Sequence, residues 1–316
     1  MIASDVSLGC QAPDEQVTAY LSLGVIDRIG NNFCRSPNSI SCVEDVQKYR
    51  TFRMRCLAMT LGIVDDCGVP AKAIVSVCLK RLDSIRRKLN RTSANFKLGR
   101  LDDVIGVRVI CQSLQDVLDF GSRIEQVPDS RTKNYVKEPS DTGYRGVHGI
   151  LSFSQPAGGG VKLRTRFEIQ VRTYLQHRWA VWSEAHGEAV KVGSGNSEEH
   201  LHLRQQSQKI AKWECENPDQ IPYQFPKYIG GRSLAVCWRP EYGPATLNYF
   251  EDEVLKALRW LNYLEENYPA RRRTALLLVG VAEHSDTERL IKETHPLYAG
   301  IRVIDPKYLI PKGLFD

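Results

Sequence analysis

The sequence predicts an α+β or mixed α/β fold, in which helices flank a mixed sheet and a smaller α/β region follows at the C-terminus. Short β-branched apolar runs alternate along the chain with segments whose apolar residues recur every three or four positions. Apolar residues make up 42% of the 316 residues and charged residues 25%, which excludes a disordered, collagenous or coiled-coil chain. This length suits one large or two modest domains.

The first part of the chain is predicted to be helical up to a buried strand. Residues 1–44 form an N-terminal extension with a short helix near Gln16–Ile29, and Val43–Ile63 has the spacing of an amphipathic helix. Another amphipathic helix is expected over Ala71–Leu89. Val104–Cys111 is β-branched and almost continuously apolar, which indicates a central strand buried on both faces.

The middle of the chain alternates between both patterns. In chain order it predicts a helix over Leu114–Ile124, strands over Val147–Phe153 and Lys162–Val171, and helices over Thr173–Val192 and Glu198–Glu214. The glycine triplet Gly158–Gly160 is predicted to be a hairpin connection. No Lys-Ser or Lys-Thr pair follows it, as a phosphate-binding loop would require.

Prolines and glycines between Asn217 and Gly231 predict a boundary, after which residues 225–316 form a C-terminal α/β region. The predicted elements there are strands over Leu234–Trp238, Thr274–Val281 and Ile301–Ile304, and helices over Leu247–Asn267 and Asp286–Thr294. No motif in this region points to chemistry, and its role stays open.

The charge is concentrated in two places. The formal net charge is +6, yet Lys80–Arg100 contains eight basic residues and Asp83 alone as an acid. Lys162–Arg178 contains five basic residues and only Glu168 as an acid. Such blocks favour an anionic partner, either nucleotide phosphates or a nucleic-acid backbone, but a solvated helix face has the same composition.

The sequence also predicts a cytoplasmic protein without a membrane partner. No apolar stretch approaches the roughly 20 residues that span a bilayer, and the first residues do not resemble a secretory signal. The nine cysteines are scattered and form no Cys-x-x-Cys pair, which suits buried thiols in a reducing compartment.

Polar residues interrupt the apolar strands where chemistry is expected. Asp103 opens the first central strand and Arg108 lies inside it, while Glu168, Gln170 and Arg172 alternate so that they share one strand face. A charged row on a central strand is costly unless it is paired or binds a ligand. Two interpretations follow: an internal network of salt bridges, or a site where carboxylates hold a hard cation such as Mg²⁺ and arginines hold phosphates.

The segment before the second strand adds an aromatic candidate. In Gly143–His148, Tyr144 lies between a glycine and Arg145, which suits an exposed ring that stacks on a nucleobase. Alone, this pattern is also typical of an ordinary turn before a strand.

Together and in this order, four segments resemble the synthetase domain of RelA/SpoT-type alarmone synthetases, which move pyrophosphate from ATP to the 3′-hydroxyl of GDP or GTP. The segments are Ser84–Arg91, Asp103–Arg108, Gly143–His148 and Glu168–Thr173. The resemblance covers the segment 45–216 and implies a nucleotidyltransferase-like mixed sheet.

The resemblance also implies a role for each matching residue. Asp103 and Glu168 would bind Mg²⁺ and act in catalysis, with Glu168 activating the acceptor hydroxyl. The implied ATP-binding residues are Lys88, Arg91 and Arg108, and the implied acceptor-binding residues are Tyr144, His148, Gln170 and Arg172. Pyrophosphoryl transfer needs an aligned nucleophile and cations that spread the developing charge, which agrees with these residue types.

The chain departs from the family on the acceptor side, where Asn134, Ser140 and Gly146 replace the usual residues. Three functions therefore stand. They are a small alarmone synthetase acting on GDP or GTP, a toxic relative that pyrophosphorylates the CCA end of tRNA, and a catalytically inactive nucleotide-binding module. The presence of both Asp103 and Glu168 disfavours the last. A neutralising antitoxin or a homo-oligomer is left open as a partner.

Overall fold

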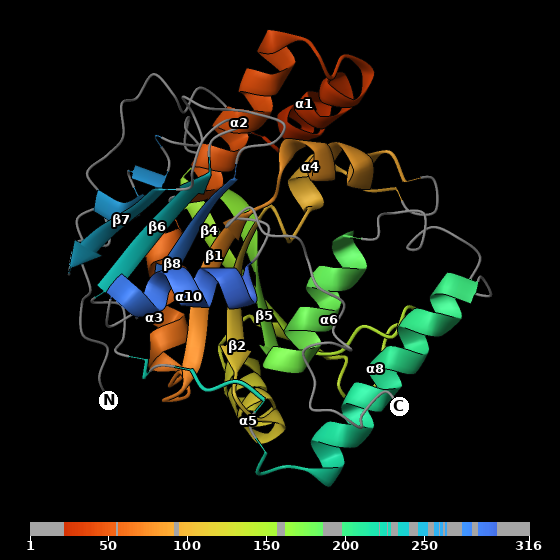
Figure 1. The fold of residues 1–316 in the computed structure, drawn as a ribbon. Helices are drawn as coiled ribbons and strands as arrows, with labels where there is room; N and C mark the ends of the chain where they lie inside the picture. The colour runs from red at the N-terminus through yellow and green to blue at the C-terminus, as the bar shows by residue number, and fades with distance from the viewer. Residues whose placement is uncertain are drawn as a thin grey trace.

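Figure 1 shows the computed structural model of the chain, in which a twisted sheet lies between helices. The structure describes residues 22–54, 56–91, 95–156, 162–185, 198–220, 222–225, 227–228, 233–239, 246–251, 256–258, 260–261, 263, 274–279 and 284–295. The predicted fold class is confirmed, with a mixed sheet, flanking helices and a C-terminal α/β region.

The described strands form one sheet in the order β3-β4-β5-β2-β1-β8-β6-β7. The strands are β1 (Ala73–Leu79), β2 (Ile105–Cys111), β3 (Arg131–Asn134), β4 (Val147–Pro156), β5 (Lys162–Thr173), β6 (Ser233–Arg239), β7 (Thr246–Glu251) and β8 (Thr274–Val279). The neighbours β2 and β5 are parallel, and the other neighbouring pairs are antiparallel. β1 and β2 lie inside the sheet and bury apolar residues on both of its faces, which explains their apolar composition.

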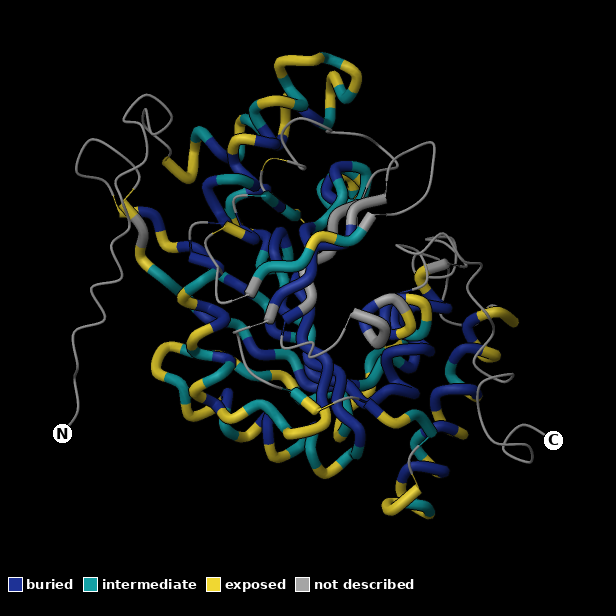
Figure 2. The backbone as a smooth tube through the Cα atoms, turned by 60° about the vertical axis from the view of Figure 1, so that its left-hand side comes forward, coloured by how far each residue is buried: buried dark blue, intermediate teal, exposed yellow. Residues whose placement is uncertain are grey.

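Helices cover both faces of this sheet. They are α1 (Leu23–Arg35), α2 (Ile40–Met54), α3 (Leu57–Asp66), α4 (Leu82–Leu89), α5 (Leu114–Glu125), α6 (Tyr174–Ala185), α8 (Glu198–Glu216) and α10 (His284–Thr294). Apolar residues of α2, α3 and α5 pack on one face, where α1 packs on α2 and α4. Those of α6 and α10 pack on the other face, where α8 packs on α6 (Figure 1). Figure 2 shows the buried residues concentrated along the strands between these layers. Within the described residues, no helix combines the length and apolarity that crossing a membrane requires.

β1 and α4 replace the single helix predicted over Ala71–Leu89. Residues 73–79 pair with β2 on one side and with β8 on the other, so this segment lies in the middle of the sheet. Apolar positions spaced by three or four residues fit a helix, but a strand buried on both faces also shows a nearly continuous apolar run. The β-branched residues Ile74, Val75 and Val77 favour the strand that the structure contains.

Two other predicted helices differ from the structure. The predicted helix over Leu247–Asn267 begins instead as β7, which pairs with β6 at the sheet edge. The predicted helix over Val43–Ile63 is divided into α2 and α3. The elements predicted around β2, β4, β5, β6, β8, α5, α6, α8 and α10 are confirmed within a few residues at their described ends. The glycine triplet 158–160, residues 186–192 and the strand predicted over 301–304 lie outside the described residues.

The C-terminal region extends the central sheet. β8 pairs with β1, so β6 and β7 join the same sheet as the strands of the synthetase-like segment. The end of α10 is held by polar contacts: Ser76 Oγ lies 3.2 Å from His295 Nε2, and the His177 ring contacts the Thr294 carbonyl. The division of the chain at residues 44, 216 and 225 stays a prediction.

Candidate functional site

Polar side chains form a row across the sheet on the face that α6 covers. As the alternation predicted, Glu168, Gln170 and Arg172 lie on one face of β5, because the intervening residues are buried against the opposite core. His148 on β4 and Arg108 on β2 are each in register with Gln170, one on either side. The strand pairing therefore brings residues that are 60 positions apart in the sequence into one row.

Five side chains close a ring of hydrogen bonds within this site. Arg172 Nη2 donates to Gln170 Oε1 at 2.7 Å, and Gln170 Nε2 donates to Glu168 Oε2 at 2.6 Å. His148 Nδ1 lies 2.9 Å from Glu168 Oε1, and His148 Nε2 lies 2.5 Å from the Tyr144 hydroxyl. Arg172 Nε donates to that hydroxyl at 2.7 Å, which completes the ring. The four predicted acceptor residues thus lie together with Glu168.

The hydrogen bonds of the ring run from Arg172 towards Glu168, because these two residues differ in hydrogen-bonding capacity. Arg172 can only donate hydrogen bonds, and an ionised Glu168 can only accept them. On one side the amide of Gln170 connects them. On the other side the Tyr144 hydroxyl accepts from Arg172 and donates to His148 Nε2, so the His148 proton on Nδ1 points to Glu168. In this arrangement each of the five contacts of the ring joins a donor to an acceptor.

Burial and hydrogen bonding set the protonation of the ring. Burial acts to raise the pKa of Glu168, but the hydrogen bonds from His148 and Gln170 and the nearby imidazole outweigh it and lower this pKa. Burial raises the pKa of Tyr144, while the Arg172 guanidinium beside it opposes this rise. Glu168 is therefore ionised and Tyr144 protonated near neutral pH, as the ring requires.

Asp103 lies just before β2 and is paired with two lysines. Lys80 Nζ, directly after β1, and Lys88 Nζ, in the last turn of α4, lie 2.8 and 2.9 Å from Asp103 Oδ2. Burial acts to raise the pKa of this carboxyl, but the two ammonium groups lower the pKa to about 2. Asp103 is a carboxylate at any physiological pH.

Lys80 is the residue of this group that sequence analysis did not assign. In a continuous helix, Lys80 and Lys88 would be separated by about 12 Å along the axis. Because β1 ends at Leu79 and α4 begins at Leu82, both lysines instead reach one carboxylate oxygen. Had the segment before Lys80 been predicted as a strand, the sequence would have placed Lys80 at a strand end near Asp103.

The remaining predicted residues are placed less directly. Arg91 follows α4, and its backbone N–H donates to the Lys88 carbonyl at 3.4 Å. Arg108 projects into the polar row next to Gln170. The salt-bridge network considered from the sequence would have paired the two carboxylates with arginines. In the structure, the pairs are Asp103 with lysines and Glu168 with His148.

The residues present fit a divalent cation bound together with phosphates. Asp103 Oδ1 is buried and has no hydrogen-bond partner among the described residues, although Oδ2 of the same carboxylate has two. Glu168 is near enough for the Asp103 charge to raise its pKa. The described residues contain no group of three or more acidic, histidine or cysteine side chains arranged for a metal. Mg²⁺ commonly needs only one or two carboxylates when substrate phosphates supply further oxygens.

Helix α8 holds the loop that carries Tyr144. Gly143 has a φ of 90°, and a Cβ at this position would lie 3.1 Å from Arg204 Cα, so the loop approaches the α8 backbone as only glycine permits. Ser207 Oγ donates to the Gly143 carbonyl, and Arg145 Nε donates to Ser207 Oγ at 3.3 Å. The position of Tyr144 thus depends on a helix 60 residues further along the chain.

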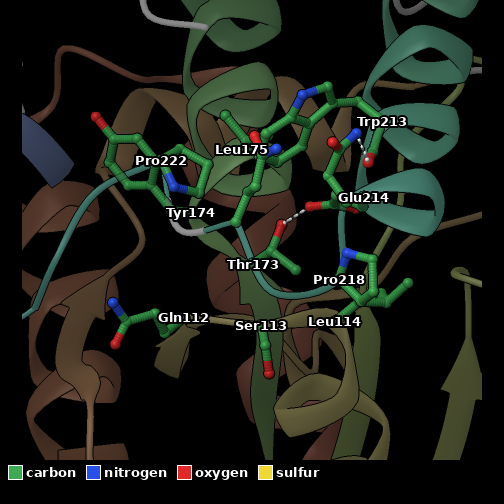
Figure 3. Close-up of a pocket in the computed structure, with 12 residues that line it drawn as sticks. Gln112, Ser113, Leu114, Thr173, Tyr174, Leu175, Trp213, Glu214, Pro218 and Pro222 are labelled. Atoms are coloured by element: carbon green, nitrogen blue, oxygen red, sulfur yellow. Dashed lines mark hydrogen bonds between the residues drawn. The ribbon is translucent and has the colours of Figure 1, made fainter. Parts of the chain in front are cut away.

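A separate small cavity lies at the opposite end of β2 and β5 (Figure 3). Its volume of about 20 Å³ suits one water molecule, whereas small-molecule pockets typically measure roughly 300–1,000 Å³. Glu214 lines it, and burial raises the pKa of this carboxyl to about 7, against hydrogen bonds from Thr173 and Gln176. This cavity is not a nucleotide site.

Comparison with known proteins finds similarity over part of the chain. Residues 78–191 match the family model described as a region found in RelA / SpoT proteins. The chloroplastic GTP diphosphokinase CRSH1 of Oryza sativa subsp. japonica is 33% identical over 118 residues, which are 33% of this chain and 19% of that protein. The GTP pyrophosphokinase YwaC of Bacillus subtilis (strain 168) is 29% identical over 109 residues, or 32% of this chain and 51% of the relative. The matches thus span at most about half the length of either relative.

Two solved structures align with part of this chain. The small alarmone synthetase 2 from Bacillus subtilis aligns with a TM-score of 0.42 and 20% identity, over 54% of this chain and 94% of that one. The small alarmone synthetase 1 from Bacillus subtilis bound to its product pppGpp aligns with a TM-score of 0.38 and 23% identity, over 45% of this chain and 74% of that one.

Proposed function

We propose, from the match of residues 78–191 to the region found in RelA / SpoT proteins, that the chain is an ATP-dependent pyrophosphokinase. It would transfer the βγ-pyrophosphate of ATP to the ribose 3′-hydroxyl of GDP or GTP and so make the alarmone (p)ppGpp. The observation that carries this proposal is that Glu168 of β5 lies opposite Gly106 at the start of β2, three residues after the lysine-paired Asp103. Proteins with which the region shares sequence are named GTP diphosphokinase or pyrophosphokinase.

On the donor side, the cations near Asp103 would hold the triphosphate. Lys80 and Lys88 already lie within 3 Å of a carboxylate oxygen, so phosphate oxygens could take the same contacts. Arg91 and Arg108 would add positive charge as the pyrophosphate leaves the α-phosphate. Asp103 and Glu168 would hold Mg²⁺, which when bound neutralises phosphate charge.

On the acceptor side, Glu168 would take the proton of the attacking 3′-hydroxyl. The acceptor must open the hydrogen-bonded ring, because both oxygens of Glu168 are engaged within it. Once the ring opens, Tyr144 is free to stack on a base, and His148, Gln170 and Arg172 are left with polar atoms for the acceptor. Arg172 lies 4.7 Å above the Tyr144 ring, which keeps a cation next to the incoming nucleotide.

The 3′ CCA end of tRNA is a second candidate acceptor, as in the toxic relatives. Lys162, Arg164 and Arg166 lie on the same face of β5 as Glu168, and the first two are exposed. A basic track that leads away from the catalytic carboxylate suits a phosphate backbone longer than that of a mononucleotide.

One labelling experiment tests both candidates. The purified chain is incubated with γ-labelled ATP and Mg²⁺ in parallel with GDP, GTP or deacylated tRNA, and the labelled product is identified. Label on GDP or GTP supports alarmone synthesis, and label on tRNA alone supports the toxin-like reaction. Absence of label in every reaction, with ATP binding retained, would leave a nucleotide-binding module.

A further inference from the structure

Arg53 is a charged side chain buried behind the candidate site. It lies in the last turn of α2, and only 1% of its surface is exposed. No carboxylate among the described residues pairs with its guanidinium. Arg53 Nη1 donates instead to the Tyr49 hydroxyl at 2.9 Å, and its Cζ lies 5.3 Å from the Phe167 ring centre. A buried charge without a counter-ion is costly, so its other contacts must explain it.

Those contacts are two backbone carbonyls from distant parts of the chain. Arg53 Nη1 donates to the Leu101 carbonyl at 3.2 Å, and Nη2 donates to the Arg166 carbonyl. Leu101 is two residues before Asp103, and Arg166 is two residues before Glu168. One planar guanidinium therefore connects the two backbone segments that carry the proposed metal-binding carboxylates.

The ladder between β2 and β5 does not reach Asp103, and β1 holds this segment only as far as Val104, whose carbonyl accepts from the Lys80 backbone N–H at 2.9 Å. The parallel ladder between β2 and β5 begins with Gly106 opposite Glu168, so Asp103 precedes the ladder. Besides Arg53, the Arg166 side chain holds this segment through Asp102 Oδ1 and the Arg100 carbonyl, both at 2.8 Å. Of these two arginines, Arg53 is the one shielded from water and salt.

We propose that Arg53 is a positioning residue, which sets the separation at which Asp103 and Glu168 share one divalent cation. This inference rests on the proposed function for the identity of the metal-binding pair. A lysine could not replace it, because a single ammonium nitrogen lacks the two-pronged geometry that reaches both carbonyls. A displacement of about 1 Å at a catalytic group can cost roughly a hundredfold in rate.

Arg53→Lys is the central variant, and Arg123→Lys is its matched control. Arg123 also donates to two backbone carbonyls, those of Cys67 and Gly68 at 2.6 and 3.0 Å, and lies over an aromatic ring, but it holds a loop remote from the site. We would measure the melting temperature, the kcat of pyrophosphate transfer, the KM for ATP, and the affinity for Mn²⁺ alone by electron paramagnetic resonance. Asp103→Asn identifies the Mn²⁺ signal that belongs to this site.

The expected result separates positioning from stability. Both lysine variants should lower the melting temperature, but only Arg53→Lys should lower kcat, by about tenfold to a hundredfold, with KM for ATP within about twofold. It should also weaken the Asp103-dependent binding of Mn²⁺. Tyr49→Phe removes one acceptor of Arg53 and little volume, and it should lower kcat by a smaller factor. This variant replaces Arg53→Lys in the test if Arg53→Lys does not fold.

Two results would overturn the proposal. One is an Arg53→Lys protein, or failing that a Tyr49→Phe protein, whose kcat and Mn²⁺ affinity equal those of wild type. The other is an equal loss of kcat in Arg123→Lys. If the wild type transfers no pyrophosphate to any acceptor, the proposed function fails, and Mn²⁺ affinity alone decides: equal affinities of wild type and Arg53→Lys refute the positioning role, and a weaker affinity of the variant supports it.

Discussion

The two carboxylates of the site are stabilised in different ways. Asp103 is compensated by two ammonium groups on flexible side chains, that of Lys80 directly after β1 and that of Lys88 in α4. Glu168 is compensated by one imidazole and one amide, His148 and Gln170, which project from two paired strands. Asp103 is thus stabilised by the positive charge of the lysines, whereas Glu168 is stabilised by hydrogen bonds whose geometry the paired strands set.

This difference indicates how each half of the site would respond to a ligand. Lysines can move from a carboxylate to a phosphate without disturbing the backbone, so the Asp103 group suits a polyanion that enters and leaves. The ring around Glu168 is positioned by the sheet and by the loop that α8 holds, so it suits recognition of a particular acceptor. The predictions below alter one half at a time.

The largest effect is expected from the carboxylates themselves. Glu168→Gln and Asp103→Asn should each lower turnover by at least about a hundredfold. The first substitution removes the base, and both remove a negative charge that would bind the metal ion. The melting temperature, measured alongside pyrophosphate transfer, should show that both variants fold. A stable and fully active Asp103→Asn enzyme would reduce Asp103 to a structural ion-pair partner.

An intermediate effect is expected when only the charge-dependent half is changed. Lys80→Met should raise the KM for ATP about tenfold and leave the KM of the acceptor within about twofold, because one cation near the phosphates is lost. Arg87→Met removes the same charge from an exposed position in the same basic block and should change neither constant by more than about twofold. Equal effects of both variants would mean that the net charge of the block, rather than the Asp103 contact, attracts ATP.

Lys80→Met should also change the acid stability of the fold. The Asp103 pKa is about 2 in the folded protein, below its ordinary value of 3.8. The contribution of Asp103 to the free energy of unfolding is therefore present above pH 3.8 and is lost as the pH falls through about 2. Removing one lysine should move this loss toward pH 3.8. Acid titrations of wild type and variant, followed by circular dichroism, measure the shift; coincident curves would mean that Lys88 alone holds the pKa down.

A smaller effect is expected when only the geometric half is changed. Arg172→Lys keeps the charge but loses the second nitrogen, so the side chain can no longer make two hydrogen bonds at once, to Tyr144 and Gln170 in the free protein or to the acceptor when it is bound. The KM of the acceptor should rise about fivefold, and the KM for ATP should stay the same. Steady-state kinetics with each substrate varied in turn distinguish the two, and a change confined to ATP would contradict the assignment of Arg172.

The smallest effect on activity is expected outside both halves, at Glu214. Its folded pKa is about 7 and its ordinary value is 4.5, so the folded state holds a proton that the unfolded chain has already lost. The free energy of unfolding should therefore fall as the pH rises from about 4.5 through 7. Glu214→Gln should remove this decline and leave turnover within about twofold. Urea unfolding at pH 5 and pH 8 measures it; an unchanged pH dependence would show that Glu214 ionises normally.

Much of this protein was determined by local sequence. Strict alternation in β5 placed Glu168, Gln170 and Arg172 on one face, and the apolar run of β2 predicted a central strand. These inferences hold because the side-chain period of a strand is fixed by backbone geometry. The residue types alone also indicated either a salt-bridge network or a site for a cation and phosphates, since carboxylates and arginines on a central strand require a partner or a ligand.

The tertiary structure decided what local pattern left ambiguous. Residues 73–79 satisfy the spacing of a helix, and only pairing with β2 and β8 makes them a strand. That pairing is what brings Lys80 to Asp103. The contacts of Arg53 with Leu101 and Arg166, and of Ser207 with Gly143, likewise join residues at least 48 positions apart. Their physical reason is that a buried backbone carbonyl needs a donor from whichever segment the fold places beside it, and sequence spacing does not record that segment.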